Sequence, residues 1–438
     1  MTPPEGPRYA GRPSAGEERS IVKILEGMHI HQHPERIPDL TNSDLLSTHV
    51  LFLGGIGSGK TNAMKHFVAQ LRNTSGPDDV FVIFDTKGDF LRTFRRRGDA
   101  VISSAGKGEP GGVVWNLFRD LPGESRLREE EAYEIATTIF SDQLSDAGEN
   151  MFFAAAARDI FAAVTEALAA GNQYPAGPSN LELREELEGS ASDLATLLGD
   201  YPRLAGTTRF LDPDGGGYVQ SILAFLQLTL RTSFSGVFRE QGDFSVRRFI
   251  QDRGGRALFI EYDIASGASL LPVYRVLMDM AIKEALGLGR RRLQEAQRPP
   301  NFYFILDEFA LLPRLGHIAD GINFGRELGL KFLVATQNVN QVMRAYSAEM
   351  GESILSGFGT VLAFRLVDEA SRALLRQRYG ANRKQVTTLS PVFSAGARQE
   401  VFTGNVIEDW DVSGLPKGRC IASLPQESPF FMSFPKLA

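Results

Sequence analysis

The chain alternates between short apolar runs and segments whose apolar residues recur at helical spacing. Such a helical segment follows the first run, and others cover residues 318–328 and 369–379. Strands that alternate with helices in this way predict an α/β fold around a mostly parallel sheet. The apolar runs that predict strands are 48–53, 80–84, 100–102, 257–262, 302–306, 331–336 and 361–366.

The middle of the chain has a different pattern. Strand-like runs stop at about residue 117, and apolar residues such as Phe161, Val164 and Leu168 then recur at helical spacing. Turn-forming stretches rich in Pro, Gly, Asn and Asp separate these helical segments. This pattern predicts an all-helical insertion at residues 119–249.

The insertion divides the α/β pattern into two stretches. We expect residues 25–118 and 250–438 to form one discontinuous α/β domain around the helical insertion. Residues 1–24 are rich in Pro, Gly and charge, and they predict a flexible leader.

Composition narrows the class of protein. With 43% hydrophobic and 23% charged residues, the 438-residue chain has the balance of a soluble globular protein. Its net charge of -6 excludes a globally basic nucleic-acid coat but not local basic patches. Cys420 is the only cysteine, which excludes an internal disulfide and fits a reducing compartment. No run approaches the roughly 20 apolar residues of a membrane-spanning helix, and no signal peptide is evident. We therefore expect a cytoplasmic location.

The first predicted strand runs directly into a glycine-rich loop of the form G-x-x-x-x-G-K-[ST]. Glycines let backbone N–H groups surround phosphate oxygens, and the following helix offers its positive N-terminus to the same anions. Lys60 can reach the β- and γ-phosphates of ATP, and the Thr61 hydroxyl can bind Mg²⁺. The alternative, a glycine turn with an incidental lysine, is disfavoured by the strand and helix on either side. The predicted phosphate-binding residues are Gly54, Gly55, Ile56, Gly57, Ser58, Gly59, Lys60, Thr61 and Asn62.

A second acidic motif, FYFILDEF, ends another predicted strand. Carboxylates at the carboxyl end of a parallel sheet lie near a phosphate loop. Asp307 can therefore hold Mg²⁺ through water, and Glu308 can polarise the attacking water. The alternative is a solvated strand-end pair, which the glycine loop makes less favourable.

Two further residues are of the kind that couples ATP hydrolysis to movement in a motor protein. Gln337 ends the strand KFLVAT, where an amide can sense the γ-phosphate or the lytic water. Arg326 precedes this strand, and an arginine at a subunit boundary can stabilise charge in the neighbouring subunit's site. For a single arginine the pattern alone favours a surface salt bridge.

The order of these motifs resembles that of the type IV secretion coupling proteins of conjugation, of the TraD/TrwB type. That family is similar to the FtsK and HerA DNA translocases. The resemblance covers about residues 25–436. The segments that carry it include THVLFLGGIGSGKT, VFVIFDTKGDF, FYFILDEFALLPRL, GRELGLKFLVATQNVNQV and LPKGRCIASL.

The resemblance implies a RecA-like P-loop ATPase domain interrupted by a helical domain and assembled as a hexamer around DNA. It places Asp85 and Lys87 in an accessory motif beside the phosphates. It also makes Gln337 the γ-phosphate sensor and Arg326 the arginine finger. The implied partners are single- or double-stranded DNA, a relaxase or relaxosome, and secretion-channel proteins.

One departure from the family concerns the membrane. Membrane-type coupling proteins carry transmembrane helices before the ATPase domain, and this sequence shows none. The resemblance then implies either a separate membrane anchor protein at the inner face of the cell membrane, or a motor that works outside secretion.

DNA-contacting residues are harder to assign from sequence. Arg344 and Lys331 are candidates near the interior of a ring, and Arg203 and Arg209 are candidates in the insertion. For each one alone, a solvated surface charge is the favoured interpretation.

These observations lead to one main hypothesis, an ATP-driven DNA translocase. A rival hypothesis is a nucleotide-gated docking module that recruits relaxosome or effector proteins through the helical insertion. Two others keep the ATPase but change its use, to a FtsK/HerA-like motor outside secretion or to a polypeptide pump.

Overall fold

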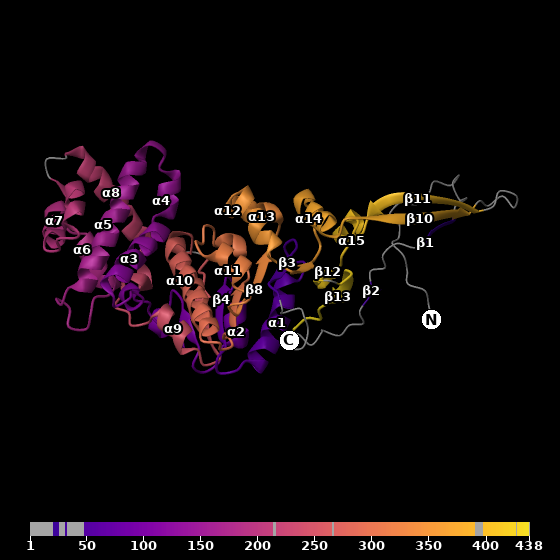
Figure 1. The fold of residues 1–438 in the computed structure, drawn as a ribbon, viewed down its shortest axis with the longest axis horizontal. Helices are drawn as coiled ribbons and strands as arrows, with labels where there is room; N and C mark the ends of the chain where they lie inside the picture. Colours follow the sequence, from indigo (N-terminus) through magenta and orange to yellow (C-terminus); the bar gives the residue numbers. More distant parts are fainter. Residues whose placement is uncertain are drawn as a thin grey trace. The chain divides into compact units, whose positions relative to one another are not determined.

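The chain divides into two compact units in the computed structural model, which is drawn as a ribbon in Figure 1. Residues 1–20 of the predicted leader lie outside the described residues, and residues 21–24 belong to a strand. The structure describes residues 21–25, 31–32, 48–212, 216–264, 267–389, 397–425 and 427–437. The first unit comprises Met1–Phe67, Ala335–Arg344 and Phe358–Ala438, and the second comprises Val68–Val334 and Ala345–Gly357.

The first unit contains strands in the order β2-β13-β12-β9-β3. The strand β3 is apolar and completely buried, and it runs parallel to β9 with Val50 opposite Thr360. The strand β12 is antiparallel to β9 and β13, so the sheet is only partly parallel at this edge. The bounds are β2 His31–Gln32, β3 Val50–Leu53, β9 Thr360–Ala363, β12 Arg419–Ser423 and β13 Phe430–Ser433.

The first unit also holds helices and a separate small sheet. Three antiparallel strands form this sheet in the order β1-β10-β11. They are β1 Ile21–Leu25, β10 Ala381–Leu389 and β11 Ala397–Asn405. The helices are the first half of α1 Lys60–Thr74, most of α12 Val339–Tyr346, α14 Glu369–Tyr379 and α15 Asp409–Ser413.

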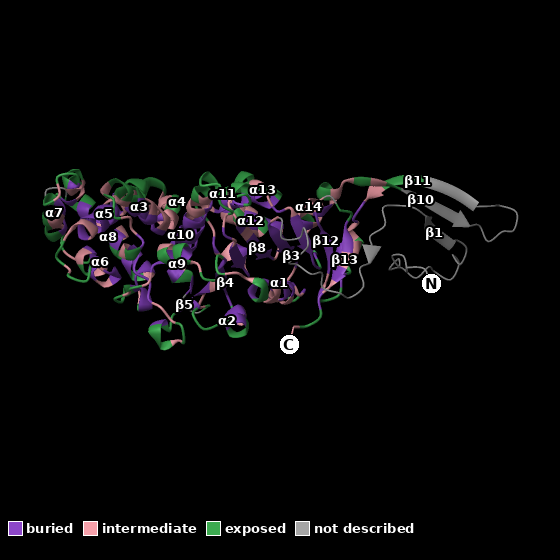
Figure 2. Cartoon of the chain, turned by 60° about the horizontal axis from the view of Figure 1, so that its bottom comes forward, coloured by how far each residue is buried: buried purple, intermediate pink, exposed green. Residues whose placement is uncertain are grey.

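The second unit is built on parallel strands in the order β8-β7-β4-β6-β5. The strand β4 lies in the middle, all six of its residues are buried, and Figure 2 shows its neighbourhood in purple. Each of these strands was predicted from the apolar runs, so the α/β class and the mostly parallel sheet are confirmed. The bounds are β4 Val80–Asp85, β5 Ala100–Ile102, β6 Arg256–Glu261, β7 Phe302–Leu306 and β8 Leu330–Thr336, whose last two residues fall in the first unit.

Helices flank these strands in the sequence. They are α2 Asp89–Phe94, α9 Val246–Asp252, α10 Gly267–Gln294, α11 Ile318–Phe324 and α13 Ala348–Ser356. The helix predicted around residues 318–328 is shorter than expected. It ends at Phe324, and the turn that follows includes Gly329, whose φ of +91° favours glycine.

Between residues 119 and 249, the described residues form helices, turns and one isolated bridge at Phe244. The central helix is α5, and α3 and α8 pack against it. Its apolar stripe is buried, with Phe161 and Leu168 fully inaccessible. The helices are α3 Ser125–Ile139, α4 Ser141–Asp146, α5 Met151–Ala170, α6 Asn180–Leu187, α7 Ala191–Gly199, η5 Ala205–Leu211 and α8 Gly217–Ser233.

A buried polar cluster joins the points where the chain enters and leaves this helical segment. The Trp115 indole donates to Asp120 at 2.7 Å, and the Ser245 hydroxyl donates to the same carboxylate at 2.6 Å. Burial raises the pKa of Asp120, and these hydrogen bonds oppose that shift. The domain boundaries predicted from the sequence remain a prediction, because the helical segment belongs to the same compact unit as the strands β4–β7.

Candidate nucleotide-binding site

The glycine-rich loop lies in the first unit, between β3 and α1. Backbone hydrogen bonds hold both of its first residues. The Gly54 N–H donates to the Thr336 carbonyl at 3.3 Å, and the Gly55 N–H donates to the Arg365 carbonyl at 2.9 Å. The loop is therefore fixed to the ends of β8 and β9, as a site at the carboxyl edge of parallel strands requires.

Two glycines of the loop are required by close packing. A Cβ on Gly59 would lie 2.9 Å from the backbone of Gly418, and its φ is +110°. A Cβ on Gly54 would lie 2.6 Å from the Cβ of Phe364. The Gly418 N–H also donates to the Ser58 carbonyl at 2.8 Å. The loop thus needs glycine both for its conformation and for its contact with the C-terminal strands.

Lys60 begins α1 and is buried, with 8% of its surface exposed. Its Nζ donates to the carbonyls of Gly54 and Gly55, so the ammonium lies within the curve of the loop. Thr61 is the next residue of α1. A cation enclosed by a glycine loop at a helix N-terminus fits the phosphates of a nucleotide.

The first turns of α1 also hold the C-terminal segment. The Asn62 amide donates to the Pro435 carbonyl at 2.8 Å and accepts from the Leu437 N–H at 2.9 Å. His66 lies 2.8 Å from the same carbonyl. The Asn62 side chain therefore has a structural partner.

Gln337 lies directly after β8 in the first unit. Its N–H donates to the Gln341 side chain at 3.3 Å, and the buried Thr336 hydroxyl donates to the Asn338 carbonyl at 3.2 Å. These contacts form the tight turn into α12, and the Val339 N–H extends it with a 3.0 Å bond to Ser371. Gln337 is thus held at the carboxyl end of β8, where the sequence predicts it.

The acidic pair lies in the second unit, at the carboxyl end of β7. Asp307 is 4% exposed, and its N–H continues the pairing with β4 through the Phe84 carbonyl at 3.4 Å. Glu308 precedes the short turn η8 Phe309–Leu311 and accepts the Leu311 N–H on its carbonyl at 3.2 Å. Two carboxylates therefore stand at a strand end, as the motif predicts.

Asp85 ends the neighbouring strand β4 and is completely buried. Its carboxylate accepts the N–H groups of Lys87, Asp89, Phe90 and Leu91 at 2.8–3.3 Å. It therefore fixes the loop into α2, and these bonds account for its burial. The Lys87 side chain is exposed.

Arg326 lies in the turn after α11, and its side chain is exposed. No ion pair of Arg326 is seen within the described part of the chain. The nearby Phe324 is 68% exposed. An exposed arginine beside an exposed aromatic ring is available to another molecule.

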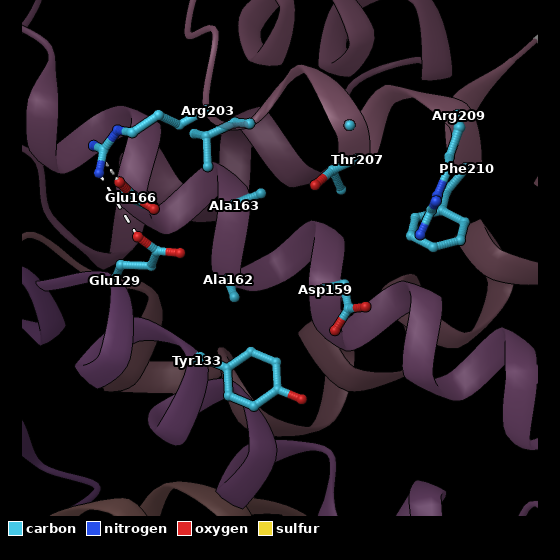
Figure 3. A pocket seen from close by; sticks show the side chains of 12 residues that line it. Glu129, Tyr133, Asp159, Ala162, Ala163, Glu166, Arg203, Thr207, Arg209 and Phe210 are labelled. Atoms are coloured by element: carbon cyan, nitrogen blue, oxygen red, sulfur yellow. Dashed lines mark hydrogen bonds and ion pairs between the residues drawn. The ribbon is translucent and has the colours of Figure 1, made fainter. Parts of the chain in front are cut away.

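The four candidate DNA contacts have different surroundings. Arg344 is exposed, whereas Lys331 is half-buried over the ring of Tyr303 at 5.5 Å, and burial lowers its pKa. Arg203 and Arg209 line one pocket of about 310 Å³ in the helical segment, which Figure 3 shows.

Both arginines of this pocket already contact other side chains. Arg203 pairs with Glu166 at 2.7 Å and reaches Glu129 at 3.7 Å (Figure 3). Arg209 stacks on the ring of Phe210 at 4.8 Å. Carboxylates therefore offset the positive charge of this pocket.

Residues far away in the sequence also support the glycine loop, and the sequence patterns do not reveal them. Gly418 is the main one, because its backbone packs directly on Gly59 and Ser58. The only signal was its place in LPKGRC, a segment that carries the family resemblance and that lies directly before the observed strand β12. Contacts between residues so far apart in sequence need the fold itself.

The carboxylates at the end of β7 fit the ligands that a magnesium–nucleotide complex takes from a protein. In the described ranges, no group of three or more His, Cys, Asp or Glu side chains could hold a metal ion. Magnesium typically takes one or two carboxylates and completes its shell with water and substrate phosphates.

None of the helices that the structure describes is long and apolar enough to span a bilayer.

Comparison with known proteins now decides the family. A family model described as the type IV secretion-system coupling protein DNA-binding domain matches residues 39–406. The chain belongs to this family. The resemblance drawn from the ordered motifs is therefore confirmed.

Individual members of the coupling-protein family are only distantly similar in sequence. Coupling protein TraD of Escherichia coli (strain K12) is 21% identical over 390 residues, which cover 86% of this chain and 51% of TraD. The chain thus spans about half the length of that curated relative.

Solved structures of the family share the fold. The bacterial conjugative coupling protein TrwBdeltaN70, in an unbound monoclinic form, has a TM-score of 0.72 at 19% identity and covers 90% of this chain and 86% of its own. Plasmid coupling protein TrwB in complex with ADP and Mg²⁺ has a TM-score of 0.71 at 17% identity and covers 99% of this chain and 97% of its own. These likenesses establish the RecA-like α/β fold of the family for this chain.

Proposed function

We propose that this protein is an ATP-driven DNA translocase that acts as a coupling ATPase in conjugative transfer or type IV secretion. The observation that supports this most is the buried Lys60 ammonium inside a glycine loop at the start of α1, in a chain of the coupling-protein family. The nucleotide in the related TrwB structure supports the same assignment.

The proposed roles follow the motifs. Lys60 and the loop N–H groups bind the phosphates of ATP, and Thr61 and Asp307 hold Mg²⁺. Magnesium supplies positive charge that offsets the charge of the phosphates. Glu308 orients the attacking water, and Gln337 responds to the γ-phosphate. We place Asp85 and Lys87 in the accessory motif beside the phosphates. The support for this role is less direct, because backbone N–H groups already engage the Asp85 carboxylate.

The proposed assembly is a homo-oligomer, as a hexamer around DNA, in which Arg326 enters the neighbouring subunit's site. The exposed and unpaired state of Arg326 within the described residues supports this role. A relaxase or relaxosome, secretion-channel proteins and a separate membrane anchor protein are the proposed partners at the inner face of the membrane.

The first experiment measures the steady-state ATPase rate of the purified protein, alone and with single- or double-stranded DNA, at two salt concentrations. We expect a rate that DNA stimulates and that salt suppresses, because phosphate contacts release counterions. Lys60→Ala should abolish hydrolysis with an unchanged circular dichroism spectrum. Lys107→Ala is the control, since this exposed lysine makes only a 3.7 Å ion pair with Asp243.

An ATP hydrolysis rate that does not change when DNA is added would favour the docking-module or polypeptide-pump hypotheses instead. Normal hydrolysis by Lys60→Ala would refute the proposed site itself. A mixing experiment then tests Arg326, since inactive Arg326→Ala and Lys60→Ala subunits should restore activity when combined. The control mixes Lys60→Ala with Arg290→Ala, which changes an exposed arginine on α10. Arg290→Ala subunits keep both Lys60 and Arg326, so this mixture shows the activity that an intact finger and an intact loop together give.

A further inference from the structure

The segment after the acidic pair is held by the helical segment through charged side chains. This segment, residues 307–317, is called the acidic loop below. It contains Glu308 at one end and Arg314 near the other. Arg314 donates to Asp142 of α4 at 2.6 Å and to the Ser141 carbonyl at 3.4 Å. Both partners belong to the helical segment and lie in the same compact unit as the acidic loop.

The Asp142 carboxylate is itself fixed from another side. Its second oxygen accepts from Arg275 of α10 at 2.8 Å, and the Arg275 side chain is 2% exposed. Arg275 also donates to the Ser141 hydroxyl at 2.9 Å. Isolated surface ion pairs contribute little because ordering two side chains costs entropy. Here the carboxylate is already ordered by a buried arginine, so Arg314 binds a preformed partner.

Arg314 also holds an unusual backbone conformation. Its φ is +61°, in the left-handed region that L side chains rarely adopt. Such strain persists only where the surroundings impose it, and it concentrates at functional segments. The side chain of Arg314 is held by its contacts with α4 at this point of the backbone.

The rest of the acidic loop transmits this constraint to Glu308. Phe309 stacks on Tyr346 with ring centroids 5.0 Å apart, and the Tyr346 hydroxyl donates to the Leu312 carbonyl. Between them, η8 closes with a 3.0 Å bond from the Leu312 N–H to the Phe309 carbonyl. The loop from Glu308 to Leu312 is thus one rigid turn, and Arg314 fixes the chain that leaves it.

We propose that Arg314 is a positioning residue for ATP hydrolysis, which holds the Glu308 loop against the helical segment through Asp142. The inference rests on the proposed ATPase function. It implies that a molecule bound to α4 would change the hydrolysis rate by moving Asp142. A water-orienting carboxylate acts in the chemical step, so its displacement lowers kcat more than it raises KM.

The test uses a substitution that separates positioning from stability. Arg314→Gly removes the ion pair but relieves the positive-φ strain, so the thermal midpoint should hold or rise. We expect kcat for ATP to fall about tenfold, with KM within about twofold of wild type. The matched control is Arg253→Gly, because Arg253 also has positive φ, at +56°, and a 3.6 Å ion pair with Asp78. This control should leave kcat unchanged.

A double-mutant cycle tests the route through Asp142. In an Asp142→Asn background, Arg314→Gly should have no further effect on kcat, and Arg314→Lys in the wild-type background should restore part of the rate. A wild-type kcat for Arg314→Gly would overturn the inference. So would a double variant in which the effects of Arg314→Gly and Asp142→Asn on kcat multiply. A wild-type protein that hydrolyses no ATP, with or without DNA, would instead refute the proposed function on which the inference rests.

Discussion

The glycine loop and the acidic loop are held by different kinds of contact. Backbone atoms and absent side chains hold the glycine loop, with Gly59 against Gly418 and Gly54 against Phe364. Charged and aromatic side chains hold the acidic loop through Asp142, Asp279 and Tyr346. The glycine contacts admit no added side chain, whereas the side-chain contacts can be weakened in steps.

This difference teaches where regulation can act. A loop fixed by close backbone packing has essentially one conformation, which suits a constant task such as binding phosphate. A loop fixed by ion pairs from a helical segment responds to whatever changes those pairs. Under the role proposed for Arg314, the acidic loop is the region through which a change in the helical segment would alter hydrolysis.

The largest expected effect comes from removing Asp279 of α10. This carboxylate is 4% exposed and accepts the N–H groups of Gly316 and His317 at 3.0 and 2.8 Å. Asp279→Ala removes the acceptor of both of these partly buried hydrogen bonds. We expect a loss of about 3 kcal/mol in the free energy of unfolding, measured by denaturant titration, because hydrogen bonds to charged groups are each worth about 1.5–3 kcal/mol.

Asp159→Ala is the control for this prediction. Its carboxylate pairs with the adjacent Arg158 at 2.7 Å on α5 and lies partly exposed, so the loss should stay below about 1 kcal/mol. Equal stability losses for the two variants would show that side chains do not fix the acidic loop as described.

A smaller effect is expected from adding a methyl group to the glycine loop. Gly59→Ala forces a Cβ to within 2.9 Å of the Gly418 backbone at a φ of +110°. We expect a loss of about 2 kcal/mol from strain and displacement of the loop, together with loss of ATP binding measured by calorimetry.

Gly57→Ala separates steric contact from backbone strain in that loop. Gly57 has a φ of +72°, but nothing lies within 4 Å of an added Cβ. It should cost only about 1 kcal/mol. If both alanine variants bound ATP equally well, packing on Gly418 would not be what requires glycine at residue 59.

The same contrast explains what the sequence could predict. The glycine loop and the pair Asp307-Glu308 were found because backbone geometry and strand-end chemistry leave local patterns. The strands were found because burial imposes apolar runs. The contacts of Arg314 with Asp142 and of Trp115 with Asp120 and Ser245 left no pattern, since their specificity lies in pairings set by helix packing. The end of α11 at Phe324 was missed because a glycine inside a helical pattern does not by itself mark an end.

The smallest expected effect is a pH dependence confined to the acidic loop. The His317 imidazole lies 3.4 Å from Asp279 and 3.4 Å from Glu134, and Lys283 is also near it. Burial alone would lower the pKa of His317, but the hydrogen bond and charge of Asp279, with the charge of Glu134, outweigh it and raise the pKa above 6.5. The protonated ring is thus the form that the folded protein favours.

The sign of the pH effect follows from this shift. A histidine whose pKa is raised on folding contributes its full stability below its ordinary pKa of 6.5, and the contribution is lost as pH rises through the higher folded value. The difference in unfolding free energy between wild type and His317→Gln should therefore be largest below pH 6.5 and shrink above it. A difference that grew with pH would mean that the neutral ring is the favoured form. The carboxylates of Asp279 and Glu134 would then hold the acidic loop without any help from the charge of His317.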